Sequence, residues 1–162
     1  MDRRDVSTWI SGPRAAAAAA GVDWGYRGQR LGLPAHGPGS LAGFGRRLAA
    51  LALDWVAALA ITRLFLPGET YGTPRYSLVT LGVFGLEVFL LTRLAGASLG
   101  QRLLGVRVIS LVPRPLGWGR ALVRTALLCL AVPALIWDRD GRGMHDRAVA
   151  TAVIRVARVQ AS

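Results

Sequence analysis

Lysine is absent from this 162-residue chain, so its net charge of +11 comes from 20 arginines set against nine acidic residues. A chain this basic raises the question of nucleic-acid binding. The arginines, however, flank apolar segments and form no single basic face. Attraction to anionic lipid headgroups explains the same charge more simply, and we predict no nucleic-acid partner.

Residues that supply metal-binding and nucleophilic groups are also scarce. Cys129 is the single cysteine, which excludes an intramolecular disulfide and a multi-cysteine metal site. The two histidines, His36 and His145, have no partners at ligand spacing. No Ser or Cys stands in a nucleophile elbow, and the glycine-rich pieces lack the phosphate-binding G-x-x-x-x-G-K-[ST] pattern. We therefore predict no metal, no cofactor and no enzymatic activity.

Long apolar runs are what the chain does have. Residues 48–66 and 76–95 are each nearly continuous apolar segments. The first would be about 28 Å long as a helix, close to the thickness of a bilayer's hydrocarbon core. We predict two transmembrane helices, with the small residues of one packed on those of the other. The small residues concerned are Gly82 and Gly85 on the second and Ala50, Ala57 and Ala58 on the first.

The distribution of charge predicts how this hairpin is oriented. Arg46 and Arg47 precede it, several arginines follow it, and the turn 67–75 carries one Glu and one Arg. Positive charge flanking a membrane helix marks the cytoplasmic side. The N-terminus is therefore expected in the cytoplasm, with the chain crossing out and back.

A third apolar segment, residues 121–137, is at the short limit for a span, and it contains Arg124 and Pro133. A crossing would place the arginine-rich C-terminal tail outside, against the positive-inside rule. The alternative is a helix that is embedded in the membrane or lies in its interface. We favour this second interpretation, and the side of the C-terminus stays open.

Two short segments predict a small β element beside these helices. Residues 98–112 read as an interfacial helix that turns into a strand, and residues 151–156 are rich in β-branched side chains. Pairing of 151–156 with 106–109 would form a cytoplasmic hairpin or sheet. The predicted fold is an all-α integral membrane protein with two transmembrane helices, a third membrane-embedded or interfacial helix and this β element.

The N-terminal part differs in composition from the rest. Residues 1–42 combine scattered aromatics, a six-alanine run after Pro13 and a Gly/Pro-rich stretch, so they read as a cytoplasmic lead-in and linker. The alanine run is too short and weakly apolar for a signal peptide. The expected organisation is a lead-in over 1–42, a membrane domain over 43–156 and a tail over 157–162.

Several stretches in order resemble the RDD family of bacterial membrane proteins. They are GFGRRLAALALDW from Gly43, SLGQRLLGVRV from Ser98, GRALVRT from Gly119 and DRDGRGMHDRAVATAV from Asp138. The resemblance covers residues 43–156 and implies a multi-pass protein of the bacterial plasma membrane. By match to the family's pattern of one arginine and two aspartates, these residues are Arg47, Asp54 and Asp146.

The resemblance implies a location more than an activity. Transport is the usual suggestion for the family, with cation/proton antiport proposed for some members. Residues 1–42 lie outside the resemblance and look like the lead-in of actinobacterial members. Many members have a longer apolar region before the terminal His-Asp pair, enough for two further crossings, whereas this chain has only residues 121–137 there.

The charged residues inside the apolar segments each have more than one interpretation. Asp54 is either a proton- or cation-binding carboxylate or a structural acceptor that joins helices, with Arg124 or Arg47 as its partner. Glu87 would join Asp54 and Arg124 in a polar cluster, or pair with Arg93, or face a partner subunit.

The His145–Asp146 pair is interpreted as an organiser of the tail against Arg46 or Arg47, because a lone His-Asp pair is weak evidence for catalysis.

Two functions of different classes follow from these features. The first is transport of a cation or small solute, which would require a homo-oligomer or a partner membrane protein, because two or three helices do not enclose a pathway. The second is a structural or assembly protein that docks a cytoplasmic partner through its arginine-rich face. Neither the substrate nor the partner is specified by the sequence.

Overall fold

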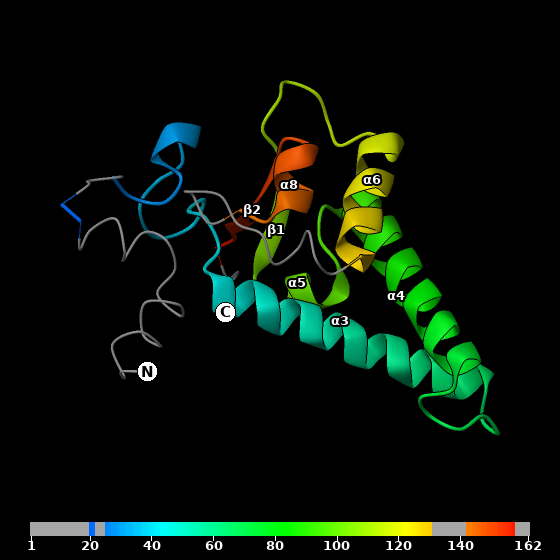
Figure 1. Ribbon diagram of the computed structural model, residues 1–162. Helices are drawn as coiled ribbons and strands as arrows, with labels where there is room; N and C mark the ends of the chain where they lie inside the picture. Colours follow the sequence, from blue (N-terminus) through cyan, green and yellow to red (C-terminus); the bar gives the residue numbers. More distant parts are fainter. Residues whose placement is uncertain (1–19, 22–24, 131–141, 158–162) are drawn as a thin grey trace, which may run out of the picture.

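The computed structural model describes residues 20–21, 25–130 and 142–157, and its two longest elements are helices α3 (Phe44–Phe65) and α4 (Pro74–Ala95). The two helices lie close together where the chain connects them and diverge toward their other ends (Figure 1). Both are long and apolar enough to cross a membrane, and most of each lies on the protein surface. The predicted helices at 48–66 and 76–95 are thus confirmed as elements, each starting a few residues earlier than expected.

Local sequence explains where α4 begins and ends. Thr73 is its N-cap and accepts a hydrogen bond from the backbone N–H of Tyr76 at 3.3 Å, while Pro74 occupies the first helical position. Gly96 ends the helix in the left-handed conformation, with φ of 72°. Because glycine adopts this conformation without a steric penalty, the chain can turn sharply back toward α3.

At the contact between α3 and α4, a small residue of α3 packs against larger residues of α4. Ala58 packs with Phe84 and Val88 in a buried cluster, and the Trp55 and Phe84 rings meet edge to face at 5.4 Å. The expectation for the glycines of α4 is wrong. Gly85 instead faces the thiol of Cys129, and nothing described lies within 4 Å of a Cβ at Gly82.

The predicted interfacial helix and strand follow directly. Helix α5 (Leu99–Leu103) leads into strand β1 (Val106–Ser110), which pairs antiparallel with strand β2 (Thr151–Arg155). Val106 opposes Arg155 and Ser110 opposes Thr151 in the register. The prediction that these two segments pair is therefore confirmed, although the cytoplasmic location of the sheet stays a prediction.

The last residues of the predicted linker belong to this sheet. Leu41 bridges to Ile154, and the backbone N–H of Ala42 donates to the carbonyl of Val153 at 2.8 Å. Ala42 also packs in the small core formed with the valines of β1 and β2. The boundary after residue 42 stays a prediction, and the predicted alanine-run helix after Pro13 lies outside the described residues.

Two further helices cover one side of the hairpin and sheet. Helix α6 (Trp118–Cys129) packs on α4, with the Trp118 and Phe89 rings 5.7 Å apart and the Arg93 guanidinium 4.8 Å from the Trp118 ring centre. Helix α8 (Met144–Ala148) lies between α6 and β2. The third apolar segment, 121–137, is helical as far as Cys129. Residues 131–137 lie outside the described residues, and the embedded or interfacial placement of the segment stays a prediction.

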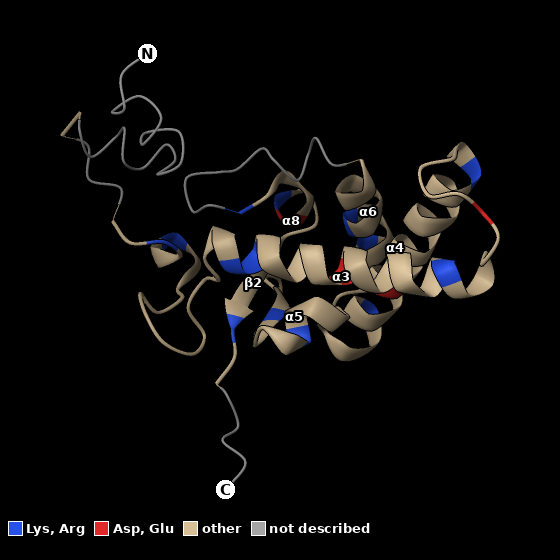
Figure 2. Ribbon diagram, turned by 90° about the horizontal axis from the view of Figure 1, so that it is seen from below, with Lys and Arg blue, Asp and Glu red and all other residues tan. Residues whose placement is uncertain are grey.

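Charge is distributed unevenly over the described residues. Arg63 and Arg75 lie at the end where α3 and α4 connect, beside Glu69, and all other described arginines lie toward the sheet and helices α5, α6 and α8 (Figure 2). The hairpin therefore has one nearly neutral end and one strongly basic end.

Gly100 is the position where α5 touches the backbone of α3. A Cβ at this residue would overlap the carbonyl oxygen of Ala50 and come within 3.0 Å of the Asp54 carboxylate. We predict that Gly100→Ala destabilises the protein by at least the about 1–3 kcal/mol typical of overpacked cores. Thermal unfolding of the full chain in detergent, followed by circular dichroism, measures the change.

Gly82→Ala is the matched control for this prediction, because a Cβ at Gly82 meets nothing within 4 Å and alanine favours the helix. It should leave the unfolding midpoint unchanged or raise it slightly. Equal midpoints for the two variants would show that α5 does not dock on α3 as described.

Candidate functional site

Asp54 projects from the middle of α3 toward the start of α5. Its side chain is 2% exposed, and both carboxylate oxygens accept hydrogen bonds there. The Ser98 hydroxyl donates to one oxygen at 2.6 Å, and the backbone N–H of Gly100 donates to the other at 2.5 Å. Ser98 is the N-cap of α5 and Gly100 its second residue, so Asp54 caps a helix from outside.

Glu87 of α4 caps the same helix from the other side. One of its carboxylate oxygens accepts a hydrogen bond from the backbone N–H of Leu99 at 2.8 Å. The hydroxyl of Ser98 accepts from the N–H of Gln101, whose side chain in turn accepts from the N–H of Ser98. These two acids of the long apolar helices therefore hold α5 between α3 and α4.

The hydrogen-bond partners of Asp54 in the structure differ from the arginines expected from the sequence. The structural acceptor interpretation matches the geometry, but the partners are neutral donors of α5 in place of Arg124 or Arg47. Glu87 does not pair with Arg93, whose guanidinium stacks on Trp118. No polar cluster of Asp54, Glu87 and Arg124 in mutual hydrogen bonding is formed.

Arg124 is engaged elsewhere, in a buried ion pair that joins α6 to α8. Its Nε lies 2.8 Å from an Asp146 carboxylate oxygen, and the two side chains are 2% and 0% exposed. The Thr151 hydroxyl donates to the same oxygen at 3.0 Å, which adds β2 to the junction. A buried ion pair of this kind needs such supporting hydrogen bonds to offset the loss of hydration.

The charges around Asp146 set the protonation states of the pair. Burial by itself raises the pKa of the Asp146 carboxyl, but the positive charge of Arg124, with smaller effects from His145 and Arg47, brings that pKa below its ordinary value. Burial also lowers the pKa of His145 to about 4, although the neighbouring Asp146 opposes this shift. At neutral pH the aspartate is charged and the histidine is neutral.

The tail is thus organised mainly by Arg124, and less directly by the arginines expected for this role. Arg46 donates to the carbonyl oxygen of Leu104 at 3.3 Å. Arg47 lies close enough for its charge to lower the pKa values of both His145 and Asp146. His145 Nε2 lies 3.5 Å from the second Asp146 oxygen.

Arg120 links α6 to β1 and to the residues just before β2, a role that the sequence did not predict. Its guanidinium donates to the carbonyl oxygens of Val149 and Ala150 and, at 3.1 Å, to the Ser110 hydroxyl. Ala150 has a φ of 48°, in the left-handed region that is unusual for a residue other than glycine. An arginine in a GRALVRT stretch has no local signal for such a role. Ser98, in contrast, begins a Ser-x-x-Gln capping-box pattern.

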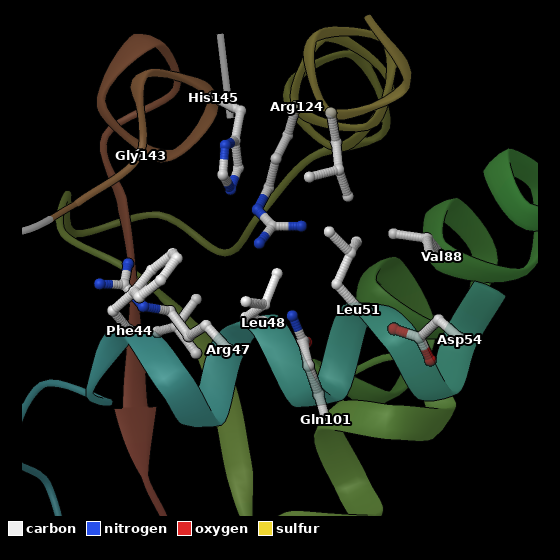
Figure 3. A pocket seen from close by; sticks show the side chains of 12 residues that line it. Phe44, Arg47, Leu48, Leu51, Asp54, Val88, Gln101, Arg124, Gly143 and His145 are labelled. Carbon is white, nitrogen blue, oxygen red and sulfur yellow. The ribbon is translucent and has the colours of Figure 1, made fainter. Parts of the chain in front are cut away.

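A cavity of about 90 Å³ lies between the Asp54 and Asp146 centres, and its lining comes from five helices and one strand. In Figure 3 the Arg124 guanidinium projects from α6 toward Leu48 and Leu51 of α3, with His145 beside it. Arg47 and Asp54 lie along α3 on either side of these leucines. The remaining lining residues include Phe44, Val88, Gln101, Leu128, Gly143 and Val153.

The three residues of the family pattern therefore line or adjoin one cavity without forming one cluster. Arg47 and Asp54 contribute to its wall, whereas Asp146 is fully buried behind Arg124 and His145. Among the described residues, no group of three or more His, Cys, Asp and Glu side chains could hold a metal ion.

The Asp54 contacts generate a first stability prediction. Asp54→Leu removes the acceptor for two buried donors, each of which costs about 1–3 kcal/mol when left unsatisfied. Asp54→Asn keeps one acceptor for Gly100 and a group that can bond Ser98, so it should cost less than half as much. Chemical unfolding of both variants in detergent measures the difference. Equal losses would show that the negative charge, and not the hydrogen bonding, is what α5 requires.

His145 generates a prediction about pH. Its pKa is lowered from 6.5 to about 4 by burial, so the unfolded chain binds this proton more readily than the folded chain. The stabilisation is complete above pH 6.5 and falls as the pH drops toward 4, by up to about 3 kcal/mol. Unfolding free energies measured over this range should fall more steeply for wild type than for His145→Gln. Parallel profiles would contradict the burial of a neutral histidine.

Comparison with known proteins places the chain in a family. A family model described as RDD family matches residues 41–150, which is more than half of the chain, while no curated protein and no solved structure matches it. The match starts two residues before the resemblance at Gly43 and says nothing of an actinobacterial subtype. Together with the two apolar helices, it indicates a membrane protein. The chain belongs to the RDD family.

Proposed function

We propose that this protein is a structural membrane subunit that docks an acidic partner at one membrane surface. In this proposal α3 and α4 cross the bilayer, and α5, α6, α8 and the sheet form a module at the cytoplasmic surface of the bacterial plasma membrane. The observation that carries the proposal is the engagement of both Asp54 oxygens by α5. Because both of its oxygens accept hydrogen bonds from α5, the Asp54 carboxylate holds the module on the hairpin and is not available to bind a transported ion.

The exposed arginines of the module are the residues that would bind the acidic partner. The exposed arginines at the basic end are Arg27, Arg30, Arg102, Arg107, Arg114 and Arg147. None of these six has an acidic partner among the described ion pairs, all of which involve other residues. A surface of one sign attracts partners of the opposite sign and steers their approach. Acidic protein segments and anionic lipid headgroups both fit this description, and the proposed protein partner would approach from the cytoplasm.

Transport is the second candidate, and the cavity between the two buried centres favours it. Ionisable side chains around a cavity beside apolar helices, here Arg47, Asp54, Arg124 and His145, are the type of feature that marks ion pathways in membranes. Two long helices do not enclose a pathway by themselves, so this version requires a homo-oligomer or a partner membrane protein. Proton or cation coupling would then have to displace the α5 contacts of Asp54.

Charge reversal tests the docking proposal. A photoreactive residue placed at Leu103, between two exposed arginines, should give a cross-linked adduct of defined mass in intact cells. Arg102→Glu together with Arg107→Glu should reduce this adduct at least about tenfold, because unlike-charge contacts become like-charge contacts. Arg63→Glu with Arg75→Glu, at the other end of the hairpin, is the control and should leave the adduct unchanged.

Two results would overturn the proposal. One is an adduct that survives the reversal at residues 102 and 107 unchanged. The other is ion flux in proteoliposomes of the purified chain that disappears in a folded Asp54→Asn variant. The second result would establish the transport candidate, because this variant preserves most of the α5 hydrogen bonding.

A further inference from the structure

An arginine and a tryptophan stack on each other where α4 ends and α6 begins. Trp118 is the first residue of α6, and its ring centre lies 5.7 Å from that of Phe89 and 4.8 Å from the guanidinium carbon of Arg93. Arg93 belongs to the last turn of α4. These contacts fix the indole ring, although 51% of Trp118 remains exposed. The pair is therefore a defined feature of the surface between α4 and α6.

Arg93 has no acidic partner in this arrangement. The ion pairs of the described residues involve other side chains, and the Glu87 carboxylate is bonded to the start of α5. The Nε of Arg93 is without a hydrogen-bond partner. Stacking uses the flat face of a guanidinium, whereas its N–H donors point outward from the edge. The Arg93 guanidinium can therefore remain on the Trp118 ring and bind an anion at the same time.

Exposed apolar side chains lie next to this pair on both helices. Leu94 follows Arg93 directly and is 68% exposed, and Leu122 lies one turn after Trp118 and is 57% exposed. A partner that covers this surface must offer a negative group and apolar chains side by side. A phospholipid offers both, because its phosphate is attached to acyl chains.

The place of Arg93 along α4 also favours a lipid. The helix has 22 residues, which at about 1.5 Å per residue give about 33 Å, slightly more than the roughly 30 Å of a hydrocarbon core. Arg93 is close to its end, at the basic end of the hairpin. If α4 spans a bilayer, Arg93 and Trp118 reach the level of the lipid phosphate groups, where tryptophan rings and long basic side chains lie in membrane proteins.

We propose that Arg93 and Trp118 bind the headgroup phosphate of an anionic phospholipid. The N–H groups of Arg93 donate to the phosphate oxygens, and the acyl chains lie against Leu94 and Leu122. An anionic headgroup is preferred because a zwitterionic headgroup carries a cation that competes with Arg93 for the phosphate. The site requires that α4 crosses the bilayer, as in the proposed function, and it involves none of the six exposed arginines of the docking surface.

The fluorescence of Trp118 tests the site in a bilayer. The full chain has five tryptophans, and a parent variant with the other four replaced by phenylalanine keeps Trp118 as its sole indole. This parent is reconstituted in vesicles of fixed phosphatidylglycerol and phosphatidylcholine content, with bromine, which quenches tryptophan on contact, on the acyl chains of one lipid or the other. The ratio of phosphatidylglycerol to phosphatidylcholine beside Trp118 should exceed the ratio in the vesicle about fivefold, the factor that one arginine near an anionic surface contributes.

Arg93→Gln separates this site from the general attraction of a basic surface for anionic lipid. It should bring the lipid ratio beside Trp118 back to that of the vesicle. Arg102→Gln is the matched control, because it removes the same charge from an exposed residue of α5 at the same end of the molecule. The vesicles contain no protein partner, and this control should retain the lipid ratio of the parent.

A second measurement uses the chain with all its native tryptophans, in case their replacement disturbs folding. In a neutral detergent, phosphatidylglycerol added to the micelles should raise the thermal unfolding midpoint more than phosphatidylcholine does, because a ligand of the folded state stabilises it. Arg93→Gln should lose most of this difference, whereas Arg102→Gln should keep it.

The failures of this site and of the proposed membrane arrangement can be told apart. Clear quenching by both lipids at the ratio of the vesicle would overturn the site and leave α4 in the bilayer. Equal losses in Arg93→Gln and Arg102→Gln would also overturn it, because the effect would then come from surface charge in general. Absence of quenching by either lipid would place Trp118 outside the bilayer, against both the site and the membrane position of α4 in the proposed function.

Discussion

The contact between the Asp54 carboxylate and the start of α5 is the interaction on which the rest of this structure depends. It satisfies a buried acid and two buried donors at once, in an environment where leaving any of them unpaired is costly. It also fixes where α5 lies, because Gly100 then meets the backbone of Ala50 directly. Strand β1 follows α5 after Gly105, so the position of the sheet is set by the same contact.

The buried charges are divided between two centres with different physical roles. At Asp54 and Glu87, carboxylate oxygens accept hydrogen bonds from uncharged N–H and O–H donors, and neither acid takes part in the ion pairs of the described residues. At Asp146, an acid is neutralised by a cation and a hydroxyl. The first centre joins the long helices to α5, and the second joins α6, α8 and β2. A membrane protein with few helices needs such polar junctions, because apolar contacts between helices gain little over contacts with lipid.

Much of the fold could be predicted from the sequence because its signals are local. The two long helices follow from continuous apolar runs, and the pairing of 106–109 with 151–156 follows from their β-branched, alternating residues. The partner of Asp54 could not be predicted by matching opposite charges, because backbone N–H groups carry no sequence signature. For the same reason, the sequence does not distinguish Gly100, which touches the α3 backbone, from Gly82 and Gly85, which do not. What decides the role of a glycine is the distance to another backbone, which only the three-dimensional arrangement supplies.

The separation of the two buried polar centres gives a physical interpretation of the family pattern of one arginine and two aspartates. Asp54 belongs to the first centre and Asp146 to the second, and Arg47 lies two helical turns from Asp54 on the cavity wall. A set of residues that met at one point would indicate a single chemical site. These residues are instead spread around a cavity: Asp54 fixes the start of α5, Asp146 joins α8 to α6 and β2, and Arg47 lines the wall. The pattern is therefore best understood as part of two separate polar junctions, one that holds α5 on α3 and one that holds α8 on α6 and β2, with the cavity between them.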